Sequence, residues 1–294
     1  MNNLLRLAFV ALLFLGCSND DDPIVNNTGL EIYVSDIGNF EKGPWQILKY
    51  DGNGQNPQVF ISKNLGWPQE ILFLEDQGVV LISNFTTGSI NKHDISTGEF
   101  KGAFASGVGT PTRMKIGPDG LLYVLQWQGN GKVLRYKLDG TKVDEFTDVG
   151  VNESIGLDWD KDGNLYVSSF NGGAGGSVRK FDSSGKDQGL FISSGLQGPT
   201  NIWFDEAGNL LVNDWQGGAV RKFDAVGKSL GTAISGLSQP EGVDFFENGD
   251  FLIGNGGNGS IKMYSKDNKL IKDLVPSGFG GLRKPNAVTI RKLK

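Results

Sequence analysis

The 294-residue sequence contains one cysteine, one histidine and three methionines, and its longest uniformly apolar run has nine residues. A single cysteine excludes an intramolecular disulfide framework. A single histidine leaves one candidate for imidazole-based catalysis. Nine apolar residues are too few to cross a bilayer, which takes about 20. In contrast, 44 glycines are spread along the chain and 38% of the residues are hydrophobic, which predicts many turns around a well-buried core.

The apolar run lies near the N-terminus and has the pattern of an export signal. Arg6 precedes the run at 7–15, and Gly16 and Cys17 follow it. Residues 14–17, Phe-Leu-Gly-Cys, resemble the lipobox of bacterial lipoproteins, in which the cysteine is lipidated and becomes the first residue. An ordinary secretory signal with an incidental cysteine is the alternative. We predict a lipoprotein signal peptide at 1–16 and lipidation at Cys17.

The residues after Cys17 are acidic. The stretch 18–22, Ser-Asn-Asp-Asp-Asp, resembles the export tag that carries Bacteroidota lipoproteins to the outer leaflet, and a solvated spacer is the alternative. We therefore predict a lipidated acidic linker over 17–28 and a folded domain over 29–294. The expected location is the bacterial outer membrane, at its cell-surface or periplasmic face, with the membrane contacted through the lipid anchor alone.

The charge of the predicted domain argues against one class of partner. Without Arg6 and the three aspartates of the linker, 27 basic and 30 acidic residues remain, a net charge of −3. A nucleic-acid-binding protein needs a basic face. We therefore expect no nucleic-acid partner, and we expect a monomer.

A short motif recurs along the chain, a Pro-x-x-apolar step. Successive copies lie 43, 43, 45, 41 and 45 residues apart, and the third copy has lost its proline. The copies occupy 68–71, 111–114, 154–157, 199–202, 240–243 and 285–288.

Apolar segments of strand type follow each of the first five copies, separated by Gly-containing turns. Four short strands in every 41–45 residues, without helical periodicity, predict an all-β fold, a six-bladed β-propeller with four-stranded blades. The segment 32–34 is the second strand of the N-terminal blade, and no first strand precedes it. We predict that 285–290 supplies this strand, so that the C-terminal strand pairs with the N-terminal blade and closes the ring.

The residues that open each first strand share a face with those that leave each second strand, because the two strands are antiparallel. Trp, Phe, amide and acidic residues gather there, a composition typical of a pocket that stacks a ring and hydrogen-bonds its hydroxyls. The alternative is that the aromatic residues wedge between blades as core, and we assign roughly half of them to that role. The predicted ligand-binding residues are Gln69, Arg113, Gln126, Trp127, Asp214, Trp215 and Asn255.

His93 occupies a position of the third strand that is Tyr or Phe in the other blades. We interpret it as a repeat aromatic position filled by an imidazole. Because the only cysteine belongs to the predicted signal, Ser-His-Asp and Cys-His mechanisms are excluded.

The repeat resembles the six-bladed propellers of the gluconolactonase and regucalcin family and its NHL-repeat relatives, over nearly all of 29–294. The stretches 199–224 and 240–253 carry the resemblance most closely. In the gluconolactonase-like enzymes, carboxylates and asparagines at the first strands hold a divalent ion, usually calcium or zinc, that polarises a lactone carbonyl. The resemblance implies Glu241 as metal ligand and catalytic residue, with Asn286 and Gln69 as further metal ligands.

This implied ligand set is incomplete. Thr112, Ile155 and Thr200 stand at the equivalent positions of the other blades, and Ile155 cannot coordinate an ion. Calcium takes six to eight oxygen ligands. We therefore favour a non-catalytic propeller that binds a glycan, small molecule or protein on its aromatic and amide-rich face. The alternative is a metal-dependent hydrolase of sugar lactones or related esters, with Ca²⁺ or Zn²⁺. A lyase of the streptogramin-lyase type is disfavoured, because no histidine lies at the channel mouth.

Overall fold

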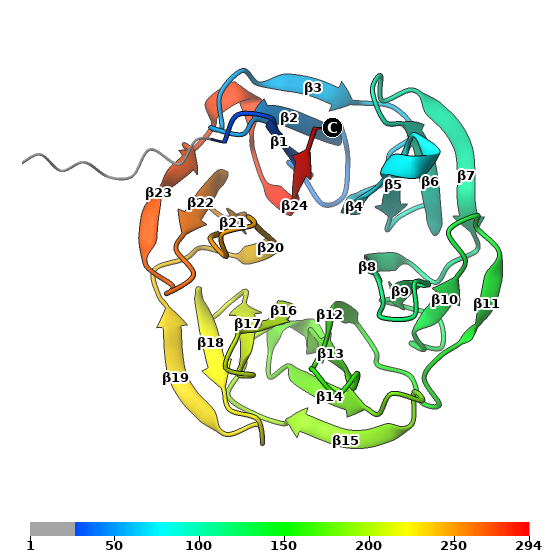
Figure 1. Cartoon of the computed structure of the whole chain (residues 1–294), viewed down its shortest axis with the longest axis vertical. Helices are drawn as coiled ribbons and strands as arrows, with labels where there is room; N and C mark the ends of the chain where they lie inside the picture. Colours follow the sequence, from blue (N-terminus) through cyan, green and yellow to red (C-terminus); the bar gives the residue numbers. More distant parts are fainter. Residues whose placement is uncertain (1–26, 294) are drawn as a thin grey trace, which may run out of the picture.

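The computed structural model describes residues 27–293. The predicted signal peptide at 1–16, the lipidation site Cys17 and most of the predicted linker lie outside the described residues. Six sheets of four antiparallel strands surround a central axis (Figure 1), so the predicted six-bladed propeller is confirmed. No helix among the described residues is long and apolar enough to span a membrane.

The strands nearest the axis are the first strands of the blades. They are β4 (Pro68–Leu74), β8 (Pro111–Ile116), β12 (Ser154–Trp159), β16 (Pro199–Phe204), β20 (Pro240–Phe245) and β24 (Pro285–Lys292). Five of these strands begin with proline and β12 begins with Ser154. Proline suits this position because a strand's first residue need not donate a ladder hydrogen bond. The second strands are β5 (Val79–Asn84), β9 (Leu122–Gln126), β13 (Leu165–Ser169), β17 (Leu210–Asp214), β21 (Phe251–Asn255) and β1 (Leu30–Asp36).

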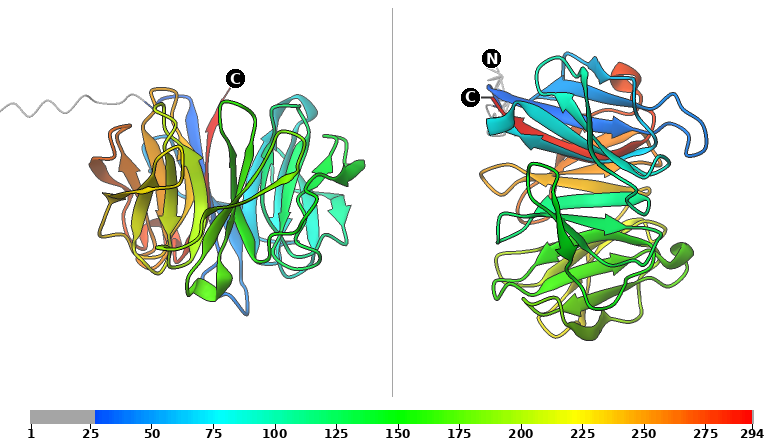
Figure 2. Two further views of the ribbon diagram at one scale, coloured as in Figure 1. Left: turned by 90° about the horizontal axis from the view of Figure 1, so that it is seen from below. Right: turned by 90° about the vertical axis from the view of Figure 1, so that its right-hand side faces the viewer.

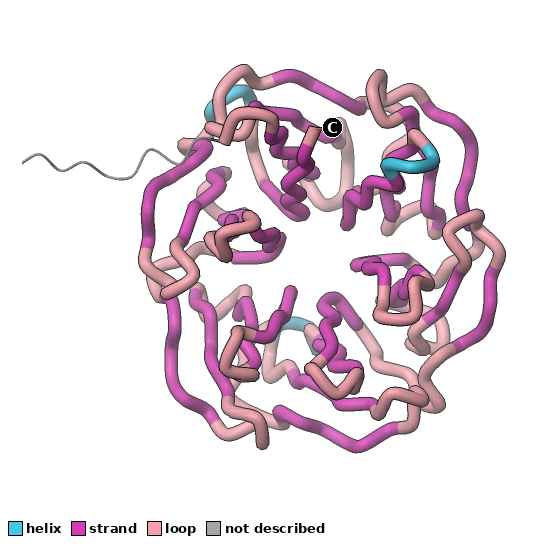
Figure 3. The backbone as a smooth tube through the Cα atoms, in the orientation of Figure 1, coloured by secondary structure: helices cyan, strands magenta, loops and turns pink. Residues whose placement is uncertain are grey.

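The third and fourth strands lie progressively further from the axis (Figure 3). The third strands are β6 (Ser89–Asp94), β10 (Leu134–Tyr136), β14 (Ser177–Phe181), β18 (Ala219–Phe223), β22 (Ser260–Tyr264) and β2 (Gln46–Asp51). The outer strands are β7 (Phe100–Ser106), β11 (Lys142–Glu145), β15 (Asp187–Ile192), β19 (Ser229–Ile234), β23 (Leu270–Val275) and β3 (Gln58–Ile61). Short 3₁₀ turns are η1 (Glu75–Gln77), η2 (Asn171–Gly173) and η3 (Phe279–Gly281).

The ring closes as the sequence predicts. β24 pairs antiparallel with β1, and Ile32 lies opposite Ile290. One blade therefore takes its first strand from the C-terminus and its other three from the N-terminus. Pairing the two chain ends leaves no open edge at the axis and ties the first and last parts of the chain into one sheet.

The core consists of apolar side chains packed between neighbouring sheets. Tyr123 and Val133 of one blade, for example, pack against Leu157 and Phe181 of the next. His93 belongs to this core. Its side chain is buried, its Nδ1 lies 3.0 Å from the Gly98 carbonyl oxygen, and its ring meets Phe100 edge-on. Burial lowers the pKa of His93, which keeps the imidazole neutral. These contacts agree with the structural interpretation of this residue.

The two faces of the ring differ in what they carry. Both ends of the described chain lie at one face, where β1 begins and β24 ends (Figure 2). The loop between β1 and β2 and the turn η2 project from the other face (Figure 2). The prolines that open the first strands are also at this second face, since Pro285 pairs with Asp36 at the end of β1. The candidate site lies here.

Candidate functional site

Six aromatic side chains surround the mouth of the central channel. Neighbouring ring centroids along this series lie 4.5 to 5.9 Å apart, at tilted or edge-on angles. In order around the mouth they are Phe40, Trp67, Phe85, Trp127, Phe170 and Trp215. We call this set the aromatic ring.

Each member of the aromatic ring is partly exposed, and each lines one cavity of about 270 Å³. Residues packed between blades as core would be buried on all sides, as Tyr123 and Phe181 are. The structure therefore assigns all six residues to the cavity wall, whereas roughly half of the aromatic residues on this face were expected to be core. Trp127 and Trp215, both predicted as ligand-binding residues, are in the wall.

Lys284 closes the gap between the two ends of the aromatic series. Its ammonium lies 4.1 Å from the centroid of Phe40 and 5.6 Å from that of Trp215. The same ammonium donates a hydrogen bond of 2.8 Å to Oε1 of Gln239. A cation over the face of an aromatic ring is attracted by the ring quadrupole, which fixes Lys284 in this position. The ammonium thus packs against the two end members of the aromatic series, although Lys284 is not itself among the residues that line the cavity.

The floor of the cavity consists of the second residues of first strands, which follow a proline or, in β12, Ser154. Gln69, Ile155, Thr200 and Glu241 come from four different blades and line the cavity below the aromatic ring. Glu241 is the only charged residue among those that line this cavity. An apolar wall with a few polar groups at its base is the usual composition of a small-molecule site.

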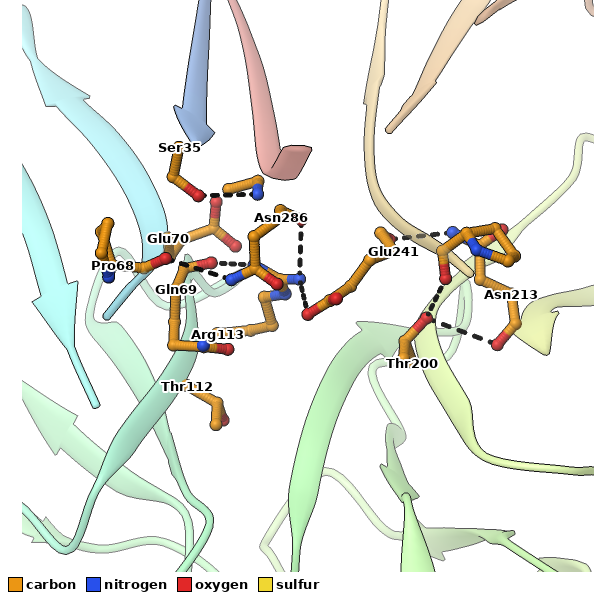
Figure 4. A network of polar contacts seen from close by, with 12 residues as sticks. Ser35, Pro68, Gln69, Glu70, Thr112, Arg113, Thr200, Asn213, Glu241 and Asn286 are labelled. Atoms are coloured by element: carbon orange, nitrogen blue, oxygen red, sulfur yellow. Dashed lines mark hydrogen bonds and ion pairs between the residues drawn. The ribbon is translucent and has the colours of Figure 1, made fainter. Parts of the chain in front are cut away.

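Arg113 crosses the channel directly beneath this floor (Figure 4). It is 1% exposed and belongs to β8, whereas its partner Glu241 belongs to β20 on the opposite side of the ring. Nη2 of Arg113 donates to Oε1 of Glu241 at 3.0 Å and to the Asn286 carbonyl oxygen at 3.1 Å. Nη1 donates to the Gln69 carbonyl oxygen. One guanidinium therefore joins its own blade to three others at the axis.

The position of Arg113 in its strand is small in three of the other blades. The equivalent residues of β12, β20 and β24 are Gly156, Gly242 and Ala287, whereas β4 and β16 have Glu70 and Asn201. A Cβ at Gly156 would lie 2.2 Å from the Thr200 carbonyl oxygen, so glycine is required where these first strands approach closely.

Burial changes the titration of the floor carboxyl. Desolvation raises the pKa of Glu241 to about 7, and the charges of Arg113 and Lys284 oppose that rise. Burial also lowers the pKa of Lys284, and the Glu241 carboxylate opposes that change. The Glu241 carboxylate on the floor and the Lys284 ammonium near the mouth therefore stabilise each other's charged form.

A second, smaller cavity of about 190 Å³ lies further along the channel, and Arg113 is among the residues lining it. Glu70 and Asp244 line it as well. Desolvation raises the pKa of Glu70 to about 7 and that of Asp244 to about 6. Both oxygens of Asp244 accept backbone N–H groups, from Phe245 and Ile290. Arg113 lines this second cavity and not the aromatic one, whereas Glu241 lines the aromatic cavity and not this one.

The residues after the prolines also bind the blades to one another. Thr112 donates to the Ser154 carbonyl oxygen at 2.7 Å, and Thr200 donates to the Pro240 carbonyl oxygen at 3.0 Å. Nδ2 of Asn286 donates to the Pro68 carbonyl oxygen at 3.1 Å. Each bond runs from one first strand to the next, so these positions form part of the scaffold.

Three of the predicted ligand-binding residues have a similar structural role. Oε1 of Gln126 accepts from the Gly109 amide, Oδ1 of Asp214 from the Gln197 amide, and Oδ1 of Asn255 from the Ser238 amide. In each case the acceptor ends a second strand and the donor lies in the loop that leads into the first strand of the same blade. Their side chains turn back to the backbone, and none of the three lines the aromatic cavity.

The three predicted metal ligands all contact the guanidinium of Arg113. Glu241 does so through its carboxylate, whereas Gln69 and Asn286 do so through their backbone carbonyl oxygens. A divalent ion would have to share this space with a fixed positive charge at 3.0 Å from the only carboxylate of the set. Within residues 27–293, no group of three or more His, Cys, Asp and Glu side chains could hold a metal ion. These residues therefore do not fit Ca²⁺ or Zn²⁺ in this arrangement.

Phe40 and Lys284 were not anticipated from the sequence. Phe40 belongs to the loop between β1 and β2, where the repeat pattern gives no register. Lys284 precedes the proline of β24, as Trp67 precedes the proline of β4. This equivalence in the repeat could have identified Lys284 as a residue near the cavity.

Comparison with known proteins supports the fold and nothing finer. The sequence matches no protein-family model, and comparison with curated proteins finds no match. Among solved structures, a chain of a nidogen/laminin complex superposes with a TM-score of 0.71 at 16% identity, covering 89% of this chain and 98% of that one. A protein of unknown function from Bacteroides caccae gives 0.68 at 14% identity, covering 90% and 99%. A gluconolactonase-family protein gives 0.59 at 15% identity, covering 72% and 79%.

Proposed function

We propose that the protein is a non-catalytic binding propeller that holds one ring-shaped organic unit, a free sugar or aromatic molecule or the terminal unit of a glycan, within the aromatic ring. The observation that carries this proposal is the wall of six neighbouring aromatic side chains around a cavity of about 270 Å³. Ligand pockets usually have roughly 300–1,000 Å³, so this cavity suits a single ring unit. Three indoles supply large apolar faces on which such a ring stacks.

The arrangement of reactive groups supports binding over catalysis. The only histidine is in the core, and the only carboxylate of the cavity floor is engaged by Arg113. A general base must reach the proton that it removes, and Glu241 is 6% exposed. The metal-dependent hydrolase is the alternative proposal, and it requires Arg113 to leave its three partners before an ion could enter.

The proposed location follows from the N-terminal sequence together with the direction of the cavity. We propose that lipidated Cys17 anchors the chain at the outer membrane. Asn27 donates a hydrogen bond to the Gly52 carbonyl oxygen, which follows the end of β2 beside the start of β1, at the face opposite the aromatic ring. An anchor attached at that end would leave the cavity facing away from the membrane. Cys17→Ala is expected to move the protein from the membrane fraction to the soluble fraction on cell lysis.

Binding is tested by calorimetric titration of the purified domain with monosaccharides and with single-ring aromatic compounds. We expect at least one class to bind, and Trp127→Ala to weaken it by about tenfold or more, as for a buried aromatic contact. Trp159→Phe is the matched control, because Trp159 packs on Tyr123 away from the cavity. If neither class binds the wild-type domain, or if Trp127→Ala leaves affinity unchanged, the proposal is rejected.

A further inference from the structure

We infer that the ring-shaped ligand of the aromatic cavity is an organic anion, whose acidic group is bound by Lys284. This inference rests on the proposed function and adds the charge of the ligand to it. The chemistry fits either a sugar acid or an aromatic acid, since both combine a ring with one carboxylate.

The argument starts from the charges around the cavity. The Glu241 carboxylate is paired with Arg113, so the floor contributes no net charge when both groups are ionised. Two further carboxylates near the mouth are also paired. Asp36 binds Arg283 at 2.8 Å, and Asp214 binds Arg221 at 3.3 Å. Lys284 has no carboxylate partner among the described residues, because its hydrogen bond goes to the neutral amide of Gln239.

Lys284 also has donors left for a ligand. An ammonium group has three N–H donors, and one of them is used by Gln239. The group lies between Phe40 and Trp215, two residues of the cavity wall. A ring stacked inside the wall would therefore hold a carboxylate substituent within reach of Lys284. A hydrogen bond between an ammonium and a carboxylate is stronger than a neutral one.

Glu153 immediately precedes the first strand β12, as Lys284 precedes β24, and its charge is opposite to that of Lys284. Its Oε2 accepts the amide N–H of Gly172 in the turn η2 at 2.6 Å. It does not line the cavity. Lys284 is not itself a lining residue, but its ammonium packs against Phe40 and Trp215 of the wall. It would repel a cationic ligand stacked there, so the cavity disfavours amines even though its aromatic wall alone would accept them.

The inference is tested with two sets of ligands that differ only in charge. The aromatic set is 4-hydroxyphenylacetate, 4-hydroxyphenylacetamide and tyramine, and the sugar set is glucuronate, glucose and glucosamine. Calorimetry at low salt gives the affinities. We expect the acid of one set to bind roughly tenfold more tightly than its neutral analogue, as a charge-assisted hydrogen bond provides. The set that binds distinguishes an aromatic acid from a sugar acid.

Variants of Lys284 assign the preference to this residue. Lys284→Met is expected to abolish the preference for the acid and to change the affinity of the neutral analogue by less than about twofold, whereas Lys284→Arg retains the preference. Lys161→Met, at a side chain that is 90% exposed, is the control lysine, and Glu153→Gln is expected to have little effect. Thermal unfolding of each variant verifies that it is folded.

Two results would overturn the inference, and they have different meanings. If the neutral or cationic member binds as tightly as the acid, the ligand is not an anion and the proposed function stands. If no member of either set binds, the proposed function fails and the inference fails with it.

Discussion

The guanidinium of Arg113 and the carboxylate of Glu241 are 128 positions apart in sequence and lie 3.0 Å apart at the axis of the propeller. They come from opposite blades, so the pair bridges the channel (Figure 4), and Glu241 also lines the aromatic cavity. Both side chains are almost completely buried, at 1% and 8% exposure. This contact occupies the place where the family resemblance implies a metal ion.

Removal of Arg113 is expected to destabilise the fold. Arg113→Met leaves the Glu241 carboxylate buried without a partner, and breaking a buried pair in this way costs about 3–5 kcal/mol of unfolding free energy. The double variant Arg113→Met/Glu241→Leu should recover a large part of the loss, because no unpaired charge remains. Urea unfolding measures both variants. A single variant within about 0.5 kcal/mol of the wild type would mean that the pair has no role in stability.

The domain is expected to become more stable as pH falls from about 7 to about 5. Burial raises the pKa of Glu241 and Glu70 to about 7 and that of Asp244 to about 6, above their unfolded values. In this window the folded chain binds more protons than the unfolded chain, so the unfolding free energy falls as pH rises through it. Below about pH 4, carboxyls whose pKa is lowered by hydrogen bonds, such as Asp51, reverse the trend.

Urea unfolding at pH 5 and pH 7 checks this prediction. Glu70→Gln should flatten the dependence, because it removes one of the three groups. His93 opposes the trend, since its lowered pKa favours protonation of the unfolded chain below about pH 6.5. His93→Phe, which restores the repeat residue, should therefore steepen it. Stability that is equal at the two pH values, or higher at pH 7, would contradict the assignment.

Calcium and zinc are expected to leave the melting temperature of the wild-type domain unchanged. A bound ion stabilises the folded state by RT ln(1 + [L]/Kd), about 2.7 kcal/mol at a hundredfold excess over Kd. The guanidinium of Arg113 excludes a dication from the space beside Glu241. Thermal unfolding with each metal and with chelator measures the effect. A stabilisation that disappears in Glu241→Ala would favour the metal-dependent hydrolase instead.

Asp214 is expected to contribute to stability without contacting the ligand. Asp214→Ala removes the acceptor of the Gln197 amide and the partner of Arg221, at a cost of about 1–3 kcal/mol. Asp214→Asn keeps an acceptor oxygen and should cost less. Trp215→Ala, at the next residue, should instead weaken ligand binding. An Asp214→Asn variant that is as stable as the wild type but does not bind ligand would show that Asp214 contacts the ligand, contrary to this prediction.

Much of the fold could be predicted because its information is local and repeated. The steps at 68–71 and 240–243 each specify a strand start, and their spacing specifies a blade. The pairing of β24 with β1 could be predicted because the N-terminal blade has no first strand of its own and the C-terminal step has no blade after it. Strand alternation also predicted that Trp127 and Trp215 share a face with Gln69 and Glu241, as the cavity shows.

The polar part of the site could not be predicted in the same way. The predicted face is correct for Gln126, Asp214 and Asn255. A side chain at that face can point toward the ligand or accept a hydrogen bond from a nearby backbone amide, as these three do. Sequence spacing does not distinguish these directions. The repeat also gave no register for the loop that carries Phe40.

The sequence by itself determined the six-bladed ring, its closure and the face on which aromatic residues gather, because strand periodicity and turn residues act over a few neighbouring positions. Only the tertiary structure decided that Arg113 crosses the axis to Glu241 and that Lys284 completes the aromatic ring. Both contacts depend on how opposite or distant blades are set around the axis. The partner of the Arg113 guanidinium is set by which side chains meet at the axis, and no pattern of neighbouring residues in the sequence specifies that.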